Sequence, residues 1–421
     1  MNSAIRVSDA PKLTFFFPYH EISGVPVLFS RLAPYVARQY GADVELVDYP
    51  DGYAYGQLSA DAAVRLVAFE DGRPVAIGGD RILVMQSMLP STMWSELEPQ
   101  SSTRMLLWTL HPLNFVQTLI PIPVVREWQS RYPWISHLAG RTVLRSFARD
   151  LAGYVSAVHA RGSLMFVDGP TYRATRTTLG IPLPSPKYVT VPCGVASQNP
   201  SRPRSAHRPL RLAWVGRLAD FKVPILRHTL AGLSALASSR SLDMEFTIVG
   251  EGPLGREIDD AAYVSDRFRI ARVGVRYGSD LNAMLLDVDA LFAMGTSALE
   301  GAKLGVPTVL LDIAYGRVPD GYVFRWLFDS EEFSLGAVMS ERPREPGNDS
   351  LARIVESLQH DWSALSARTH AYCLAHHALD RVARRFIEAA RGAGFVYGDM
   401  NPALRQKGLV RRTYESLRSA S

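Results

Sequence analysis

The amino-acid sequence predicts an α/β fold of two doubly wound domains, each built on a parallel sheet with helices on both faces. Three observations indicate this class. Short runs rich in β-branched and aromatic residues alternate with helical periods, and this alternation occurs twice along the 421 residues. Hydrophobic residues make up 47% of the chain, which is enough to fill two cores. Residues 197–210 are rich in proline, serine and arginine, as a linker between domains would be.

The first half of the chain predicts a Rossmann-like domain over residues 1–200. Its expected buried strands are residues 13–18, 42–48, 81–86, 105–110, 163–168 and 187–192. A helical period at residues 25–41 joins the first two strands. The uncharged stretch 105–125 is long enough to span a membrane, but its three prolines would break a helix there. We therefore expect a strand at its start, followed by an irregular apolar stretch.

The second half predicts another Rossmann-like domain over residues 201–393. Its expected strands are residues 210–216, 244–250, 268–274, 289–294 and 307–312. A break at residues 340–350 ends in a helix cap at Asp349 or Ser350, and helices follow it. Residues 394–421 form a basic tail, which we expect either to pack back on the N-terminal domain or to stay solvated.

The composition excludes several classes of protein. The only two cysteines, Cys193 and Cys373, lie far apart in the sequence, so neither a disulfide framework nor a CxxC metal site is expected. The first residues do not form a secretory signal, and a reducing cytoplasmic location fits best. The net charge is +5, but no nucleic-acid recognition motif accompanies it, so we expect no nucleic-acid partner.

Polar and glycine-containing segments follow the predicted strands. Ligands of open parallel sheets bind beyond the carboxyl ends of the strands, so two such domains facing each other would form a cleft lined by these segments. In the first half they contribute His20, Glu21, Ser23, Gly24, Asp48, Gln86, His111 and Asp168. In the second half they contribute Gly216, Arg217, Lys222 and residues 250–253, 274–280 and 295–305.

Four stretches of the second half form a recognisable series. They are VGRLADFK, IVGEGP, VGVRYGSDL and SALEGAKLGVPTV, in this order. The series resembles the donor-binding half of nucleotide-sugar glycosyltransferases of the GT-B fold, in particular glycosyltransferase family 4. The resemblance is clear over residues 187–315, where Cys193 replaces a usual asparagine, and in the first half it covers only residues 22–47.

The resemblance implies a site for the donor diphosphate. Arg217 and Lys222 match the family's diphosphate-binding arginine and lysine, and fixed cations of this kind stabilise the charge on the leaving phosphate without a metal or cofactor. The alternative is that both form surface ion pairs. Gly24 would let backbone amides approach the phosphate, because it has no side chain.

The resemblance also implies a site for the nucleoside. Glu300 matches the glutamate that binds the ribose hydroxyls, but Ser297 to Glu300 also has the pattern of a helix capping box, so capping is the alternative. The amides of the first helical turn, at Thr296, Ser297 and Ala298, are candidates for phosphate binding. Val275 and Arg276 are positional candidates for the base pocket.

One position departs from the family pattern. The family carries another glutamate eight residues before the second one, on a loop that helps to hold the transferred sugar, and Phe292 stands there in this chain. The loop also looks shortened, since the predicted strand 289–294 runs almost directly into the next motif. Recognition of the donor sugar is therefore open, and an inactive relative stays an alternative.

The first half should supply the acceptor site. His111, at a strand end, is a candidate catalytic or donor-orienting residue, with a merely satisfied polar role as the alternative, while Asp168 is better explained as a turn former. Within residues 126–151, three arginines spaced four apart and nearby tryptophans would suit an anionic membrane surface and a lipid-linked acceptor. The alternative, which the charge pattern favours, is an ordinary amphipathic helix with a solvated basic face.

These observations favour a glycosyltransferase that moves a hexose from a nucleoside-diphosphate sugar to a glycan or lipid-linked acceptor in cell-surface polysaccharide or glycolipid biosynthesis. The resemblance implies retention of the anomeric configuration. A cytoplasmic enzyme, peripheral at the inner face of the membrane, is expected. Two alternatives stay open: a sugar-nucleotide epimerase of the same fold, and a non-catalytic binding protein derived from it.

Overall fold

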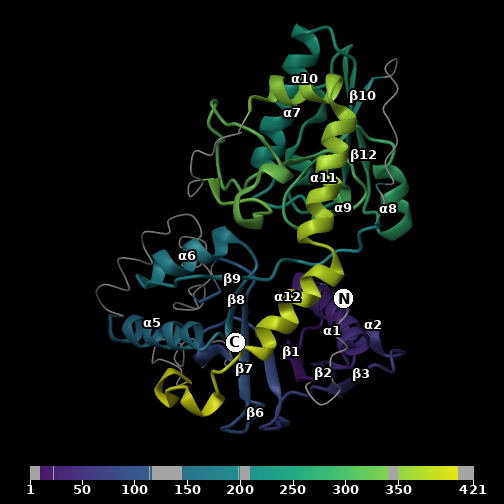
Figure 1. Cartoon of the computed structure of the whole chain (residues 1–421). Helices are drawn as coiled ribbons and strands as arrows, with labels where there is room; N and C mark the ends of the chain where they lie inside the picture. Colours follow the sequence, from purple (N-terminus) through teal and green to yellow (C-terminus); the bar gives the residue numbers. More distant parts are fainter. Residues whose placement is uncertain are drawn as a thin grey trace, which may run out of the picture. The chain divides into compact units, whose positions relative to one another are not determined.

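The computed structural model describes residues 10–21, 23–112, 114, 115, 145–197, 199, 209–339 and 349–405. The chain divides into two compact units. The first unit runs to Pro192 and resumes at Leu379, and the second unit is Cys193–Ala378. Each unit has its own sheet and helices (Figure 1). That the two sheets face each other across a cleft stays a prediction.

The first unit contains a sheet of seven parallel strands in the order β3-β2-β1-β5-β7-β8-β9. The strands are β1 (Lys12–Phe16), β2 (Asp43–Asp48), β3 (Val64–Ala68), β5 (Ile82–Gln86), β7 (Arg104–Thr109), β8 (Leu164–Phe166) and β9 (Lys187–Tyr188). A separate pair is formed by β4 (Val75–Ile77) and β6 (Leu97–Pro99). The six predicted strands are present. The prediction missed β3, β4 and β6, which are short and partly exposed.

Helices cover both faces of this sheet, as predicted. They are α1 (Gly24–Tyr40), α2 (Tyr53–Leu58), α5 (Arg145–Ala160), α6 (Gly169–Leu179) and α12 (Leu379–Arg391). Successive strand residues point to opposite faces. Accordingly, Phe15 packs in a core with α1 and α12, whereas Phe16 packs in a second core with the apolar face of α5.

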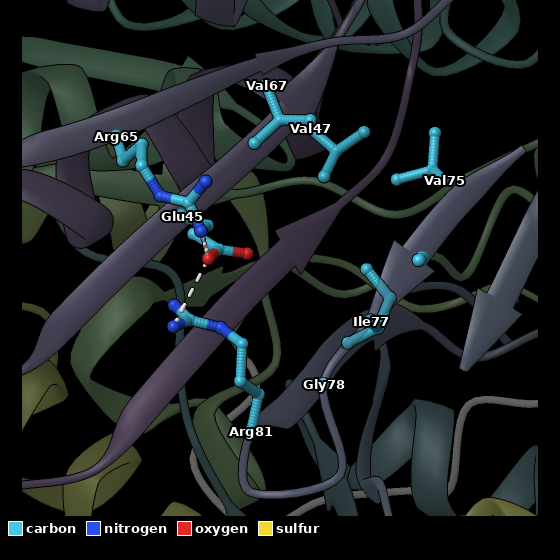
Figure 2. A pocket seen from close by; sticks show the side chains of 9 residues that line it. Glu45, Val47, Arg65, Val67, Val75, Ile77, Gly78 and Arg81 are labelled. Carbon is cyan, nitrogen blue, oxygen red and sulfur yellow. Dashed lines mark ion pairs between the residues drawn. The ribbon is translucent and has the colours of Figure 1, made fainter. Parts of the chain in front are cut away.

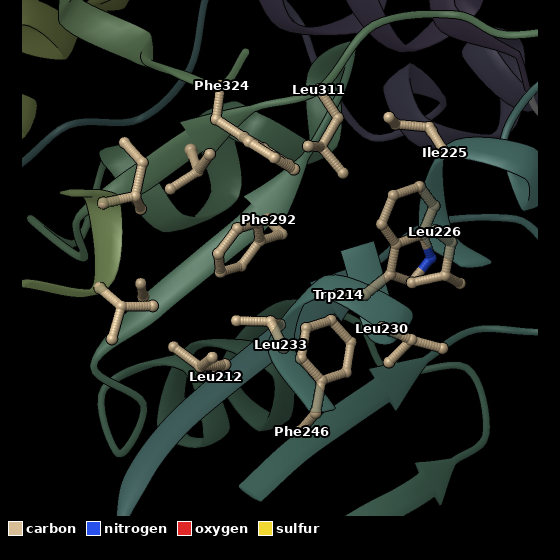
Figure 3. Packing of buried hydrophobic residues seen from close by; sticks show 14 of the residues in the cluster. Leu212, Trp214, Ile225, Leu226, Leu230, Leu233, Phe246, Phe292, Leu311 and Phe324 are labelled. Carbon is tan, nitrogen blue, oxygen red and sulfur yellow. The ribbon is translucent and has the colours of Figure 1, made fainter. Parts of the chain in front are cut away.

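The second unit contains a sheet of six strands in the order β12-β11-β10-β13-β14-β15, of which only β15 is antiparallel. The strands are β10 (Leu210–Val215), β11 (Met244–Val249), β12 (Phe268–Val273), β13 (Ala290–Ala293), β14 (Thr308–Leu310) and β15 (Arg325–Trp326). The helices are α7 (Val223–Ser239), α8 (Gly278–Leu285), α9 (Thr296–Ala302), α10 (Leu351–His360) and α11 (Trp362–His376). Trp214, Phe246 and Phe292 pack in one core together with Leu226 and Leu230 of α7 (Figure 3).

The boundaries of the units differ from the predicted ones. Cys193 belongs to the second unit, where its amide donates to the carbonyl of His377 at 2.7 Å. Helix α12 belongs to the first unit rather than to residues 201–393, because Phe386 stacks on Phe15 and Trp108 with ring centroids 5.5 and 5.9 Å away. The chain therefore crosses between the units twice.

The start of the predicted tail packs on the first unit. Phe395 is buried in that unit's core, and the amide of Met105 donates to its carbonyl at 2.8 Å. Residues 406–421, which hold most of the tail's basic residues, lie outside the described part of the chain.

The predicted apolar stretch 105–125 begins with β7, as expected. Residues 113 and 116–144 lie outside the described part. Among the helices that are described, none has the length and apolar character needed to cross a membrane.

Candidate functional site

The strand order of the second unit reverses between β10 and β13. In open α/β sheets, the crevice beyond the carboxyl ends at such a reversal is the usual place for a ligand. Gly216 and Arg217 follow β10 directly, and Gly295 and Thr296 follow β13 after one further residue. The structure therefore places the first and fourth sequence motifs at one reversal point.

Two glycine-containing loops meet at this edge with their backbones in contact. Gly250 has a positive φ of 128°, and a Cβ atom there would lie 2.2 Å from the carbonyl oxygen of Gly216. The amide of Leu218 donates to the carbonyl of Glu251 at 3.0 Å. Only glycine fits at position 250, because any side chain would collide with the loop that carries Arg217.

Lys222 and Arg217 form a cationic pair at the end of β10. Burial lowers the pKa of the Lys222 ammonium, and the positive charge of Arg217 lowers it further. The Lys222 Nζ lies 3.3 Å from the position that a Cβ atom on Gly216 would take. Within the described ranges, neither side chain has a hydrogen bond or a carboxylate partner, so the surface ion pairs weighed above do not form there.

Two other arginines of the same unit are neutralised by carboxylates. Arg325 binds Asp312 in a bidentate pair with distances of 2.7 and 3.0 Å, and both side chains are fully buried. Arg272 makes two hydrogen bonds to Asp260 at 2.5 and 2.7 Å. Lys222 is partly buried and has no such carboxylate partner among the described residues, so this edge is suited to bind an anion.

Glu300 lies on α9 and does not form the capping box. The helix begins at Thr296 and its N-cap is Gly295, which has a φ of 63° and no side chain to cap the helix. Ser297 is therefore inside the helix. The Glu300 carboxylate accepts a hydrogen bond of 2.5 Å from the Lys303 ammonium, and its side chain is 25% exposed. Of the two roles weighed for Glu300, ribose binding stays a prediction.

The first turn of α9 offers fewer amides than expected. The amide of Ala298 donates to the carbonyl of Gly295 at 3.1 Å, so the prediction that it receives a phosphate is wrong. Thr296 is exposed and Ser297 is half-buried. A phosphate role for these two residues stays a prediction.

Phe292 is a core residue of β13. Its side chain is completely buried and contacts Phe246 and Phe324 with ring centroids 6.1 and 6.4 Å away (Figure 3). Since β13 ends at Ala293 and α9 begins at Thr296, the connecting loop is as short as the sequence predicts. Position 292 points into the core, so no side chain there can reach a donor sugar.

A loop after β14 lies beside the cationic pair, and the sequence analysis missed it. The amide of Ala314 donates to the carbonyl of Phe221 at 3.0 Å, and the ring of Tyr315 lies 6.3 Å from the Phe221 ring. The pair formed by Asp312 and Arg325 fixes both ends of this loop. No local signal predicts this arrangement, because it depends on a buried ion pair between residues 13 positions apart.

The base-pocket candidates lie in the loop between β12 and α8. Val275 is 39% exposed, and among the described residues the Arg276 guanidinium donates only to the carbonyl of Val275, at 3.3 Å. A Cβ atom on Gly274 would lie 3.0 Å from a carboxylate oxygen of Glu251. The second and third sequence motifs are thus neighbours in space.

The remaining predicted residues belong to the first unit. Gly24 begins α1, is exposed, and has open space where a Cβ atom would be. His111 follows β7, and Asn114 accepts from its backbone amide at 2.8 Å. The protein around the His111 ring lowers its pKa through loss of solvation, although the residue keeps an exposed surface. Asp168 is the N-cap of α6 and accepts from Thr171 at 2.9 Å, which confirms its structural role.

The helix predicted over residues 136–151 is described only from Arg145, where α5 begins. Arg149 is exposed and Leu151 is buried, as an amphipathic helix requires. Arg126, Arg131 and Arg141 lie outside the described residues.

A pocket of about 290 Å³ opens on the first unit's sheet (Figure 2). Valine and isoleucine side chains line it, and Glu45 lies between Arg65 and Arg81. The Arg81 guanidinium also binds Thr14, Asp43 and the carbonyl of Leu13 at 2.7–2.9 Å. The two arginines are balanced by Glu45 and Asp43, and the hydrogen-bond donors of Arg81 are already occupied. This network therefore stabilises the sheet and does not select an anion.

The two thiols meet inside the second unit. The sulfur atoms of Cys193 and Cys373 lie 3.4 Å apart, and both residues are buried and reduced. The hydrogen bond to Cys193 and burial together raise the pKa of Cys373. Within the described ranges, no group of three or more histidine, cysteine or acidic residues could hold a metal ion.

No protein-family model and no curated protein matches the amino-acid sequence. Among solved structures, the chain is similar to WaaG, a glycosyltransferase involved in lipopolysaccharide biosynthesis, with a TM-score of 0.48 and 13% identity over 91% of this chain and 100% of WaaG. It is similar to TarM with a TM-score of 0.42 and 10% identity over 74% of this chain, and it spans 55% of the TarM chain. It is also similar to a Listeria monocytogenes protein described as a UDP-N-acetylglucosamine 2-epimerase, with a TM-score of 0.39 and 10% identity over 92% of this chain and 100% of that chain. These similarities assign no activity to the chain.

Proposed function

We propose that the protein is a glycosyltransferase that uses a nucleoside-diphosphate sugar as donor and a glycan or lipid-linked acceptor. The observation that carries this proposal is the cationic pair of Arg217 and Lys222, which has no carboxylate partner in the described chain and stands where the strand order reverses. Lys222 is partly buried and the charge of the exposed Arg217 disfavours its ammonium further, so a bound diphosphate would relieve that repulsion.

The chemistry follows from where charge develops. The bond between the anomeric carbon and the phosphate oxygen breaks, a bond to the acceptor oxygen forms, and the acceptor proton passes to the leaving diphosphate. Arg217 and Lys222 stabilise the negative charge that grows on that diphosphate. This role needs no metal. Retention of configuration is part of the proposal and comes from the motif resemblance.

Glu300 would bind the ribose of the donor. Its carboxylate accepts from Lys303 through one oxygen. Each carboxylate oxygen has two acceptor positions, so Glu300 can still accept from ribose hydroxyls while the hydrogen bond from Lys303 orients it. The proposal includes hexose transfer in cell-surface polysaccharide or glycolipid biosynthesis and a cytoplasmic location at the inner face of a membrane.

The proposal is tested by thermal denaturation with a panel of nucleoside diphosphates and their sugars. A ligand at a hundredfold its dissociation constant should stabilise the wild type by about 2.7 kcal/mol. Arg217→Ala and Lys222→Ala should lose this stabilisation. Arg240→Ala, which removes an exposed arginine at the far end of α7, is the control and should keep it.

A non-catalytic binding protein is the second candidate, and the buried Phe292 favours it, since the family's sugar-binding carboxylate is missing there. A panel without any stabilising nucleotide would support that candidate over the transferase. If a donor binds, its conversion without an acceptor would indicate an epimerase, and conversion only with an acceptor would indicate the transferase.

A further inference from the structure

Aromatic side chains gather at the carboxyl ends of β1, β2 and β5 in the first unit. Tyr19 and His20 follow β1, Tyr49 follows β2, and Trp94 follows β5 after one turn of 3-10 helix. Phe17 lies between them, 5.7 Å from the Tyr19 ring and 6.0 Å from the Trp94 ring, measured between centroids. We call these five residues the aromatic edge. The strand order of this sheet reverses between β1 and β5, so the aromatic edge lies where an open sheet binds ligands.

The aromatic edge has a buried base and an exposed outer side. Phe16 and Phe69 are completely buried, and they contact Trp94 and Tyr49 at centroid distances of 5.2 and 5.0 Å. Tyr19 is 38% exposed. The outer rings therefore rest on the core, and a ligand that stacks on them need not order them first.

The backbone that carries these rings is held by one buried carboxylate. Asp48 is 1% exposed and accepts from the amides of Tyr19 and Tyr49 at 2.8 and 2.9 Å. It joins the loop after β1 to the loop after β2. The spacing of the rings is thus set by the sheet and not by the loops alone.

Carboxylates border the exposed rings. The His20 ring stacks on Tyr49 at 3.8 Å with an interplanar angle of 20°, and its Nδ1 lies 2.9 Å from a carboxylate oxygen of Asp51. The Tyr49 hydroxyl donates to Asp71 at 2.8 Å, and burial together with this bond raises the pKa of Tyr49 to about 12. Both carboxylates keep further acceptor positions.

We infer that the aromatic edge binds a neutral saccharide, which, on the proposed function, is the sugar of the acceptor. The faces of a pyranose ring are covered by C–H groups and can stack on the exposed rings, while its hydroxyl groups can donate to Asp51 and Asp71. The same carboxylates, with the exposed Glu21, oppose phosphate groups and anionic lipid surfaces. The aromatic edge therefore selects the sugar part of an acceptor.

The test is saturation-transfer NMR of the full-length protein with methyl β-glucoside, methyl β-galactoside and methyl β-N-acetylglucosaminide. We expect transfer to the ring C–H protons of at least one glycoside. Tyr19→Ala should weaken its binding by roughly tenfold, the loss expected for one stacked ring, and Tyr19→Phe should restore it. Tyr40→Ala is the control, because Tyr40 ends α1 at the opposite edge of the sheet.

Two results would overturn the inference. One is no transfer to any glycoside, or transfer that Tyr19→Ala leaves unchanged. The other is binding of phosphatidylglycerol vesicles that depends on Tyr19. The nucleotide panel is independent of both. If glycosides bind through Tyr19 while no nucleotide stabilises the protein, the inference holds and the proposed transferase fails. If a nucleotide binds and no glycoside does, only the inference fails.

Discussion

The two reversal points of this molecule share a topology but differ in chemistry. In the second unit, Arg217 and Lys222 stand at the strand ends and have no carboxylate partner among the described residues. In the first unit, Asp51 and Asp71 stand at the strand ends beside stacked rings. One edge suits a polyanion and the other a neutral polyhydroxyl compound, which on the proposed function are the donor and the acceptor.

In the second unit, Arg325 has a carboxylate partner and Lys222 has none among the described residues. Arg325 is more deeply buried than Lys222, yet it has a bidentate carboxylate and a structural role. Lys222 is half-buried, and its positive charge is disfavoured by its surroundings. A stable fold tolerates such a charge at a functional position, and the substitutions below separate the two roles.

The largest effect is expected from Arg325→Met. Removing the arginine leaves Asp312 buried without its cation, and breaking such a pair costs about 3–5 kcal/mol of folding free energy. Urea denaturation followed by circular dichroism measures the loss. The double variant with Asp312→Leu should recover part of it. A loss below about 1 kcal/mol would mean that the ion pair between Arg325 and Asp312 stabilises the fold no more than an exposed ion pair does.

Lys222→Met should weaken diphosphate binding without lowering the stability of the free protein. Truncating one partner of a desolvated ion pair weakens binding by about 2–5 kcal/mol, so calorimetry should show the affinity for the stabilising nucleoside diphosphate falling by at least tenfold. The melting temperature without ligand should stay the same or rise, since a partly buried charge without a partner is removed. A strong drop in the melting temperature would assign Lys222 to the fold.

Glu300→Ala should remove discrimination between ribose and deoxyribose. Hydrogen bonds to a charged group contribute about 1.5–3 kcal/mol, so the wild type should prefer a ribonucleoside diphosphate to its 2′-deoxy form by roughly tenfold or more. The variant should bind both equally. Lys303→Ala is the companion variant and should weaken this preference less. Equal binding of both nucleotides by the wild type would contradict the ribose role.

The smallest effect is a pH dependence that arises from Lys222. The pKa of Lys222 in the folded protein lies below the ordinary value of 10.5. At a pH between these two pKa values, Lys222 is protonated in the unfolded chain and neutral in the folded protein. The stability of the free protein therefore gains a contribution as the pH rises through this window, while affinity for a diphosphate falls. The difference between wild type and Lys222→Met isolates this term. A difference that stays constant with pH would contradict it.

Much of the fold follows from local patterns. The apolar runs predict the central strands of both sheets, because a strand buried on both faces needs apolar residues throughout. The position of Asp168 before Gly169 and Pro170 predicts a turn, and the structure shows the N-cap. Short edge strands such as β3 and β15 leave no such pattern, since β3 is partly exposed and β15 consists only of Arg325 and Trp326.

The site divides in the same way. Arg217, Lys222 and Gly250 stand at strand ends that the motifs predict, because glycine and cation spacing is local to each loop. Whether Glu300 can close a capping box depends on the residue at which α9 begins. The structure places this start at Thr296, with Gly295 as the N-cap. A shift of two residues in a helix start is beyond what the sequence pattern resolves.

Two parallel-sheet domains and a cationic edge are already specified by the sequence. The signals are the order of the apolar runs, the composition of the linker and the strand-end residues, and each signal depends on residues that are neighbours in the chain. Contacts between distant segments decided the rest. Cys193 meets Cys373, α12 returns to the first unit, and Tyr19 and Tyr49 are joined through Asp48. Whether Lys222 has a partner is also of this kind, because a charge is neutralised by whatever the fold brings near it and not by its neighbours in sequence.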